Sequence, residues 1–229
     1  MMTAMNAAAS RRGPYVRAFD MRVCPLVVRF RWRFAPVEPA RIDSTGGLAI
    51  CIGDRARPYS GAMRVVTMGV TGSGKSRVGT ALAAMLGVPF ADADDFHPES
   101  NVAKMSAGIA LTDEDRWPWL DAVGDWLASH PDSVVACSAL KRAYRDRLRS
   151  HAGAVVFVHL AARQSVLVER VARRTEAEGH FAGVDLLGSQ YATLEPLRFD
   201  EVGGTVDVSH LTAQEALGEV ARIITLHDV

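Results

Sequence analysis

One stretch decides the fold: Gly69-Val70-Thr71-Gly72-Ser73-Gly74-Lys75-Ser76, which matches the pattern G-x-x-x-x-G-K-[ST]. The residues before it, 64–68, are mostly β-branched or apolar and predict a buried strand. After it, apolar residues recur at offsets of three and four up to Gly87, which predicts an amphipathic helix. A strand, a glycine-rich turn and a helix in this order indicate the first βα unit of a parallel sheet.

The chemistry of this turn is phosphate binding. Glycines let the backbone curl so that successive N–H groups point inward, and the N-terminus of the following helix adds partial positive charge. We expect Lys75 to reach the β and γ phosphates of a nucleotide and to act in catalysis, and the Ser76 hydroxyl to ligate Mg²⁺. The predicted ATP-binding residues are Gly69, Val70, Thr71, Gly72, Ser73, Gly74, Lys75 and Ser76.

Strand and helix patterns alternate along the rest of the chain, which is typical of a doubly wound parallel α/β sheet with helices on both faces. A helix over 117–130 carries tryptophans at near-helical spacing, and we expect these to pack in the core. The other predicted strands are 133–139, 154–160 and 205–208, and the other predicted helices are 142–151, 164–173 and 213–226.

Net charge divides the 229 residues into two unlike parts. Residues 1–62 hold ten Arg, no Lys and four acids, so 10 − 4 = +6, while residues 63–229 hold 16 basic and 22 acidic groups, so 16 − 22 = −6. We expect an Arg-rich N-terminal extension over 1–62 and one folded domain over 63–229. The extension has three interpretations: a mis-assigned start with Met63 as the true one, a targeting peptide, or a disordered arm that touches RNA, a membrane or a partner.

Composition also excludes some classes of protein. A whole-chain charge of zero argues against a nucleic-acid binder. The longest apolar runs, such as 154–162, are about half the length of a membrane-spanning helix, so we expect no membrane partner. Three separated cysteines, Cys24, Cys51 and Cys137, fit a reducing compartment, and we expect a cytoplasmic protein.

Two carboxylates, Asp92 and Asp94, follow the second predicted strand. Carboxylates at the C-terminal edge of a parallel strand face the same crevice as the phosphate loop. One of the pair can hold Mg²⁺ through water while the other accepts the proton of an attacking hydroxyl, which is nearly all that phosphoryl transfer requires. The alternative is a solvated acidic turn that only caps the next helix.

Several further motifs accompany this pair, in a fixed order. They are MGVTGSGKS (68–76), DADDFHPESNVAKM (92–105), LTDEDRWPWL (111–120), CSALKRAYRD (137–146), GHF (179–181), LLGSQ (186–190) and LEPL (194–197). Together they resemble the gluconokinase family, small P-loop kinases akin to shikimate and adenylate kinases, over residues 63 to about 226. The resemblance implies a nucleoside-monophosphate-kinase-like αβα fold with a mobile lid, a possible homodimer, and Mg²⁺-assisted transfer of phosphate from ATP to D-gluconate, giving 6-phospho-D-gluconate.

The resemblance also implies roles for single residues. Asp94 would orient and activate the primary hydroxyl, and Asp92 would support Mg²⁺. Arg116, Lys141 and Arg145 would bind the substrate carboxylate or the transferring phosphoryl group, and His97 a sugar hydroxyl, because an anionic polyol needs both kinds of partner. Each has a plainer alternative: Arg116 paired with Asp113, Lys141 and Arg145 as solvated helix charges, and His97 as a satisfied turn residue.

The predicted lid lies between two helices near residue 175. Arg173 and Arg174, with Arg170, are candidates for neutralising charge near ATP, and His180 for contacting substrate. The family pattern runs from basic residues almost directly into GHF, whereas this chain inserts about three residues within 175–178. The insertion puts lid geometry and turnover in doubt and leaves the reaction type intact.

Two other functions stay open at this stage. One is a related small-molecule kinase that acts on shikimate or another hydroxy acid, and the other is a P-loop ATPase that serves as a regulatory nucleotide-binding switch. The acidic pair and the CSALK motif favour an acceptor site, while the switch depends on the basic extension alone. Gln190 and Glu195 belong to the last motifs and are expected to serve in packing or capping.

Overall fold

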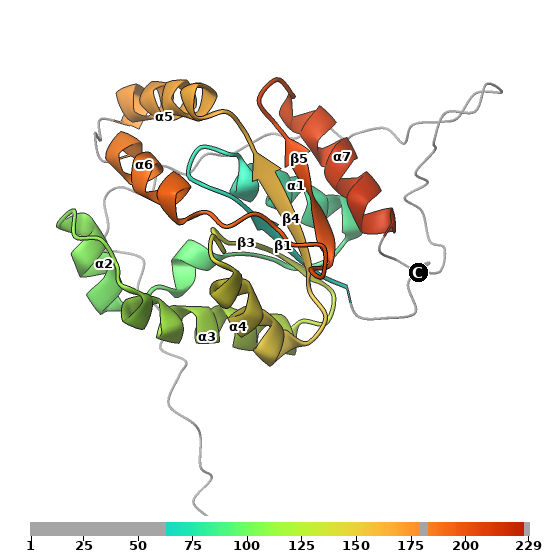
Figure 1. The fold of residues 1–229 in the computed structure, drawn as a ribbon. Helices are drawn as coiled ribbons and strands as arrows, with labels where there is room; N and C mark the ends of the chain where they lie inside the picture. Colours follow the sequence, from blue (N-terminus) through green and yellow to red (C-terminus); the bar gives the residue numbers. More distant parts are fainter. Residues whose placement is uncertain (1–62, 179–182, 227–229) are drawn as a thin grey trace, which may run out of the picture. The chain divides into compact units, whose positions relative to one another are not determined.

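The computed structural model describes residues 63–178 and 183–226, which form a five-stranded parallel sheet with helices on both faces (Figure 1). The predicted extension over 1–62 lies outside the described residues. The strands are β1 (Arg64–Met68), β2 (Phe90–Asp92), β3 (Ser133–Ala136), β4 (Val156–Ala161) and β5 (Gly203–Asp207). The doubly wound fold expected from the alternating pattern is confirmed.

The sheet has the order β2-β3-β1-β4-β5, so β1 lies in the middle. In register, Val66 of β1 is opposite Val135 of β3 on one side and Phe157 of β4 on the other. The chain runs first to one side of β1 and then, after β3, to the other. The carboxyl end of β1 is therefore a point where strand order reverses, and such points hold ligands in open α/β sheets.

Each face of the sheet has its own core. Helices α1 (Lys75–Leu86) and α7 (Ala213–Leu226) cover one face, where Val65, Leu82 and Val220 are fully buried. Helices α3 (Asp113–Ser129) and α4 (Arg142–Ala152) cover the other and pack against each other. The tryptophans of α3 contribute to this second core, as their spacing predicts.

Two more helices, α5 (Gln164–Glu178) and α6 (Gly183–Thr193), lie side by side above the carboxyl ends of the strands (Figure 1). Leu167 of α5 and Leu187 of α6 form a small core with Val70 of the phosphate loop. The remaining elements are the short 3-10 helix η1 (Ala93–Phe96) and helix α2 (Glu99–Ser106). In the described part of the chain, no helix is both long and apolar enough to cross a membrane.

Some boundaries differ from the predicted ones. Strand β3 ends at Ala136 and not at residue 139, because the chain then turns and Ala139 adopts a positive φ of 42°. Helix α3 begins at Asp113, four residues earlier than expected, because Thr112 and Asp115 form a reciprocal capping box. Helix α5 continues to Glu178, so the inserted residues 175–178 extend a helix.

Candidate active site

The phosphate loop connects β1 to α1 and is fixed at several points. The Gly69 N–H donates to the Ser138 carbonyl at 3.3 Å, which ties the loop to the end of β3. Gly69 has φ +145°, and a Cβ there would lie 2.8 Å from the Leu160 carbonyl oxygen, so only glycine fits. The Thr71 N–H donates to Gln190 Oε1 at 2.6 Å, and this bond attaches the loop to α6.

Other groups of the loop remain open to a ligand. Gly74, the N-cap of α1, has φ +91°, and a Cβ there would meet no atom within 4 Å. The Ser73 hydroxyl is buried, and no group among the described residues bonds to it. Within residues 63–178 and 183–226, the Lys75 ammonium pairs with no carboxylate. These features suit a loop that supplies donors to phosphate oxygens.

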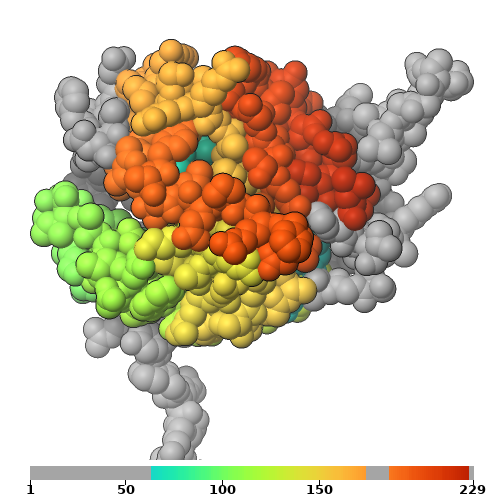
Figure 2. All heavy atoms as spheres, viewed as in Figure 1, coloured from blue at the N-terminus to red at the C-terminus, as the bar shows by residue number. Residues whose placement is uncertain are grey.

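A cavity of about 290 Å³ adjoins this loop. Arg170 of α5 spans one side, where Nη2 donates to the Val208 carbonyl at 2.7 Å. Figure 2 shows teal atoms, from the segment that begins at residue 63, in a hollow between α5 and α6, whereas the cavity itself has no lining residue from α6. The lining residues come from the loop, α1, α5, the segment between β5 and α7, and α7 itself: Gly72, Ser73, Gly74, Arg77, Val78, Arg170, Val208, Leu211, Thr212, Ala213 and Ala216.

The acidic turn follows β2 at the same edge of the sheet. Asp92 Oδ1 accepts from the Asp94 N–H at 3.2 Å, so Asp92 caps η1, while the exposed Asp94 side chain has no hydrogen-bond partner among the described residues. Burial raises the pKa of the Cys137 thiol to about 12, and the charges of Asp94, Lys75 and Asp92 also act on it. Asp92 is opposite Ala136, the last residue of β3, and the phosphate loop is bonded to Ser138 just beyond it, so the acidic turn and the loop flank the end of β3.

A cationic cluster lies beside this turn, at the start of α3 and α4. Lys141 Nζ donates to both oxygens of Asp113, at 2.6 and 2.9 Å, and Tyr144 donates to Asp113 Oδ1 at 2.5 Å. Arg116 approaches the same carboxylate at 3.6 Å. The hydrogen bond from Lys141, then that from Tyr144, lowers the pKa of Asp113, and the same Lys141–Asp113 bond raises the pKa of Lys141. Two predicted substrate cations thus share one carboxylate.

His97 adjoins the cluster from the other side. Its ring stacks on Trp119 with centroids 4.4 Å apart and an interplanar angle of 12°. Burial lowers the pKa of His97, the charge of Asp94 raises it, and the charge of Arg116 lowers it. Trp119 also bonds to the Ala93 carbonyl of η1, so the start of α3 lies against His97 and the acidic turn. Arg116 belongs to this part of α3 and shares Asp113 with Lys141.

Arg145 corrects one sequence-based expectation. Its side chain is fully buried, and it forms a two-bond ion pair with the fully buried Glu201, with N···O distances of 2.7 and 2.8 Å. A guanidinium with no exposed surface and a carboxylate of its own does not reach a substrate. Arg145 is neither a substrate ligand nor a solvated helix charge.

The predicted lid residues are only partly described. Arg173 is exposed and pairs with Glu169 one turn earlier at 3.2 Å. The side chain of Arg174 and all of His180 lie outside the described residues. Of the two residues expected to pack or cap, Gln190 binds the phosphate loop and Glu195 Oε2 accepts from the Arg142 N–H at 2.7 Å, capping α4.

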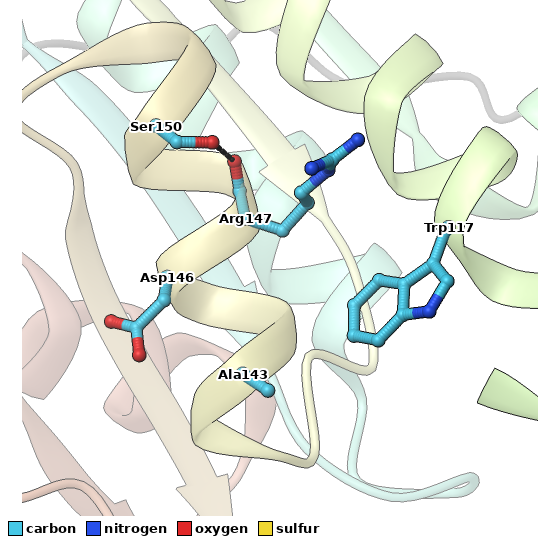
Figure 3. A pocket seen from close by; sticks show the side chains of 5 residues that line it. All are labelled: Trp117, Ala143, Asp146, Arg147 and Ser150. Atoms are coloured by element: carbon cyan, nitrogen blue, oxygen red, sulfur yellow. Dashed lines mark hydrogen bonds between the residues drawn. The ribbon is translucent and has the colours of Figure 1, made fainter. Parts of the chain in front are cut away.

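A second hollow, of about 440 Å³, lies between α3 and α4 (Figure 3). Trp117 of α3 faces Ala143, Asp146, Arg147 and Ser150 of α4 across it. Arg147 is already bonded to both oxygens of Asp121. The Ser150 hydroxyl is bonded as well, because it donates to the Arg147 carbonyl at 2.7 Å.

The central strand, its phosphate loop and the facing acidic turn define the class: a P-loop kinase for a small molecule. Comparison with known proteins supports this class, since residues 71–186 match the shikimate kinase family model. The gluconokinase of Gluconobacter oxydans 621H is 48% identical over 142 residues, which are 60% of this chain and 78% of that one. The thermosensitive gluconokinase of Escherichia coli K12 is 41% identical over 150 residues, 63% of this chain and 79% of that one.

Solved structures agree with this placement. The crystal structure of a gluconokinase from Sinorhizobium meliloti 1021 has a TM-score of 0.67 and 47% identity, covering 73% of this chain and 94% of that one. A sugar kinase from Janibacter sp. HTCC2649 has a TM-score of 0.65 and 39% identity. The chain belongs to the gluconokinase family.

Proposed function

We propose that this protein transfers the γ-phosphoryl group of ATP to a hydroxyl of D-gluconate, giving 6-phospho-D-gluconate. One observation carries the proposal: the phosphate loop with Lys75 and the acidic turn with Asp92 and Asp94 both adjoin the end of β3. The cations Arg116 and Lys141 share Asp113 at the starts of α3 and α4. A phosphate donor and an anionic polyol need these groups together. Membership of the gluconokinase family agrees with this substrate.

The roles follow from the chemistry of an in-line displacement. Asp94 takes the proton of the attacking hydroxyl, and it is exposed and unpaired among the described groups. Arg116 and Lys141 bind the gluconate carboxylate, with Asp113 holding their side chains in place. Lys75 neutralises charge on the β and γ phosphates.

Magnesium suits the donors at this edge, although the described residues contain no cluster of three or more His, Cys, Asp or Glu that would hold a metal alone. Mg²⁺ usually takes one or two protein oxygens and completes its shell with water and phosphate. The Ser76 hydroxyl and Asp92 are hard oxygen donors of that kind. The ion would supply neutralisation of phosphate charge.

Two further points belong to the proposal. ATP is available in the cytoplasm, a reducing compartment that suits the buried free thiol of Cys137, and we place the protein there. The family resemblance implies a homodimer, which light scattering on the purified protein would test.

A coupled ADP-release assay tests the function. Purified protein is given gluconate, shikimate, AMP or no acceptor, and ADP release above the blank is expected with gluconate. If ADP is released with shikimate and not with gluconate, shikimate is the acceptor and the proposed substrate is wrong. Equal ADP release in all four reactions would indicate an ATPase.

The Asp94→Asn variant tests the base. It should lose transfer by about 10²-fold or more and still bind ATP. Asp95→Asn is the matched control, because Asp95 is an exposed carboxylate on the same 3-10 helix. Equal turnover in the two variants would overturn the role of Asp94.

A further inference from the structure

The imidazole of His97 is held in one orientation by two groups. Trp119 provides a flat surface under the ring, and Trp119 is itself fixed because Nε1 donates to the Ala93 carbonyl at 2.6 Å. Asn101 of α2 contacts the ring edge, with Nδ2 placed 3.3 Å from His97 Nδ1. The ring therefore presents its other nitrogen, Nε2, away from Asn101.

A second bond of Asn101 fixes which way its amide points. Asn101 is buried, and Nδ2 also donates to the Asp115 carbonyl at 2.8 Å. A carbonyl oxygen can only accept, so the amide nitrogen and not the amide oxygen must face it. The same NH₂ group then directs its second hydrogen at His97 Nδ1.

This arrangement decides the tautomer of His97. Because Nδ1 accepts a hydrogen bond, it carries no proton, and a neutral ring must carry its proton on Nε2. No group in the described part of the chain accepts a hydrogen bond from Nε2. The Nε2–H group of His97 is therefore available to a ligand beside the acidic turn and the cationic cluster.

The charged neighbours agree with a neutral ring. Burial lowers the pKa of His97. The charge of Asp94, on η1, raises this pKa, and the charge of Arg116, on α3, lowers it. From α2, Asn101 contributes no charge, and its amide hydrogen opposes a proton on Nδ1. A neutral donor binds a hydroxyl oxygen without attracting anions away from Arg116 and Lys141.

We propose that Asn101 is a positioning residue that locks His97 as the neutral Nε2–H tautomer, so that Nε2 donates a hydrogen bond to a hydroxyl oxygen of the acceptor polyol. This rests on the proposed function for its substrate. Asp94 and His97 then treat the polyol in complementary ways, since Asp94 takes a proton from one hydroxyl and His97 gives a hydrogen bond to an oxygen. Together, Asp94 and His97 make the site specific for an acceptor with neutral hydroxyl groups.

Two substitutions at His97 test the donor. The amide nitrogen of glutamine occupies nearly the position of Nε2, while that of asparagine occupies nearly the position of Nδ1. His97→Gln should keep the gluconate KM within about 3-fold of the wild type, whereas His97→Asn should raise it by about 10-fold, the value of one hydrogen bond. The ATP KM should be unchanged in both. Equal gluconate KM values in the two variants would overturn the donor role.

The tautomer has its own test by ¹⁵N NMR of the imidazole ring in the wild-type protein. We expect the pattern of an Nε2–H tautomer for His97, assigned by its loss in His97→Gln. In Asn101→Asp the carboxylate accepts from Nδ1–H, so the proton of the neutral ring should move from Nε2 to Nδ1 and the gluconate KM should rise. A wild-type ring protonated on Nδ1 would refute the proposal, even if Asn101→Asp does not fold.

These readouts separate the two proposals. If the wild type shows the Nε2–H tautomer but releases no ADP with gluconate, the proposed substrate fails and the tautomer lock stands. If gluconate is phosphorylated and the tautomer is the opposite one, the lock fails and the function stands.

Discussion

The buried ion pair between Arg145 and Glu201 should dominate the stability of this edge of the fold. Both side chains have zero exposed surface. Arg145 donates six hydrogen bonds, two to Glu201 and one to each of four backbone carbonyls, at distances from 2.7 to 3.3 Å. The carbonyls are those of Ala139, Leu140, Glu195 and Pro196.

The perturbation is Arg145→Met, which keeps the volume of the stem and removes the charge. Glu201 would remain buried with Arg149, at 3.1 Å, as its one charged partner in the described structure. Removing one partner of such a pair costs about 3–5 kcal/mol. At about 2–4 °C per kcal/mol for a domain of this size, the melting temperature should fall by about 6–20 °C.

Thermal unfolding followed by circular dichroism measures this effect. Arg147→Met is the matched control, because Arg147 lies on the same helix, is 45% exposed, and makes a two-bond pair with Asp121. An exposed pair contributes at most about 1 kcal/mol. The double variant Arg145→Met, Glu201→Leu should recover much of the loss, since no buried charge remains. If Arg145→Met melts within about 2 °C of Arg147→Met, the reasoning is refuted.

The pair also predicts a pH dependence. Burial alone would raise the pKa of Glu201, but hydrogen bonds from Arg145 and from the Arg198 backbone outweigh it, so the folded-state pKa is lowered. A lowered pKa stabilises the fold above the unfolded-state value of about 4.3 and loses that contribution as pH falls through the folded-state value. The free energy of unfolding should therefore decline less steeply below pH 4.3 in Glu201→Gln than in the wild type, and parallel curves would contradict the assignment.

Three further predictions concern the phosphate loop. Lys75→Ala should lower turnover by about 10³-fold and weaken ATP binding in calorimetry, because its charge is lost from the transition state; near-normal turnover would exclude this role. Gly69→Ala should abolish ATP binding, since the new Cβ would lie 2.8 Å from the Leu160 carbonyl oxygen, and unchanged binding would mean that the loop shifts without cost. Gln190→Leu removes the acceptor of the Thr71 N–H and should raise the ATP KM by about 3- to 10-fold with gluconate KM unchanged; an effect on gluconate alone would contradict it.

The sequence predicts elements whose signals lie within a few residues, and it does not predict contacts between residues far apart in the chain. Strand β1, its loop and α1 were expected where they lie, because a buried strand, glycines and helical periodicity each leave a signal within a few residues. The capping box of Thr112 and Asp115 was also readable as T-x-x-D, although it was missed. The resemblance implies a substrate role for Arg145, and no residue near it in the sequence indicates otherwise, because its partner Glu201 lies 56 residues away.

In the acceptor site too, contacts between residues close in the sequence could be predicted and contacts between distant residues could not. His97 and Asn101 are four residues apart, and a histidine followed at that spacing by an amide at a helix start is a signal that was available. No sequence signal points to Tyr144, because its partner Asp113 lies 31 residues away in the chain. Gln190 lies 119 residues from Thr71, and its place in a motif was the one hint of importance.

The insertion expected at 175–178 lies beyond the part of α5 that contacts the phosphate loop. The first half of α5 is anchored: Arg170 bonds to the Val208 carbonyl, Leu167 is fully buried, and Val171 lies so close to Gly72 that a Cβ there would be 2.8 Å away. The helix continues for about 12 Å from Arg170 to Glu178, and residues 175–178 form its last turn. A rigid extension of this kind moves the point where the next segment starts and leaves the phosphate loop in place. The insertion should therefore alter how the site closes over ATP, and with it the turnover rate, while the residues that carry the reaction keep their geometry.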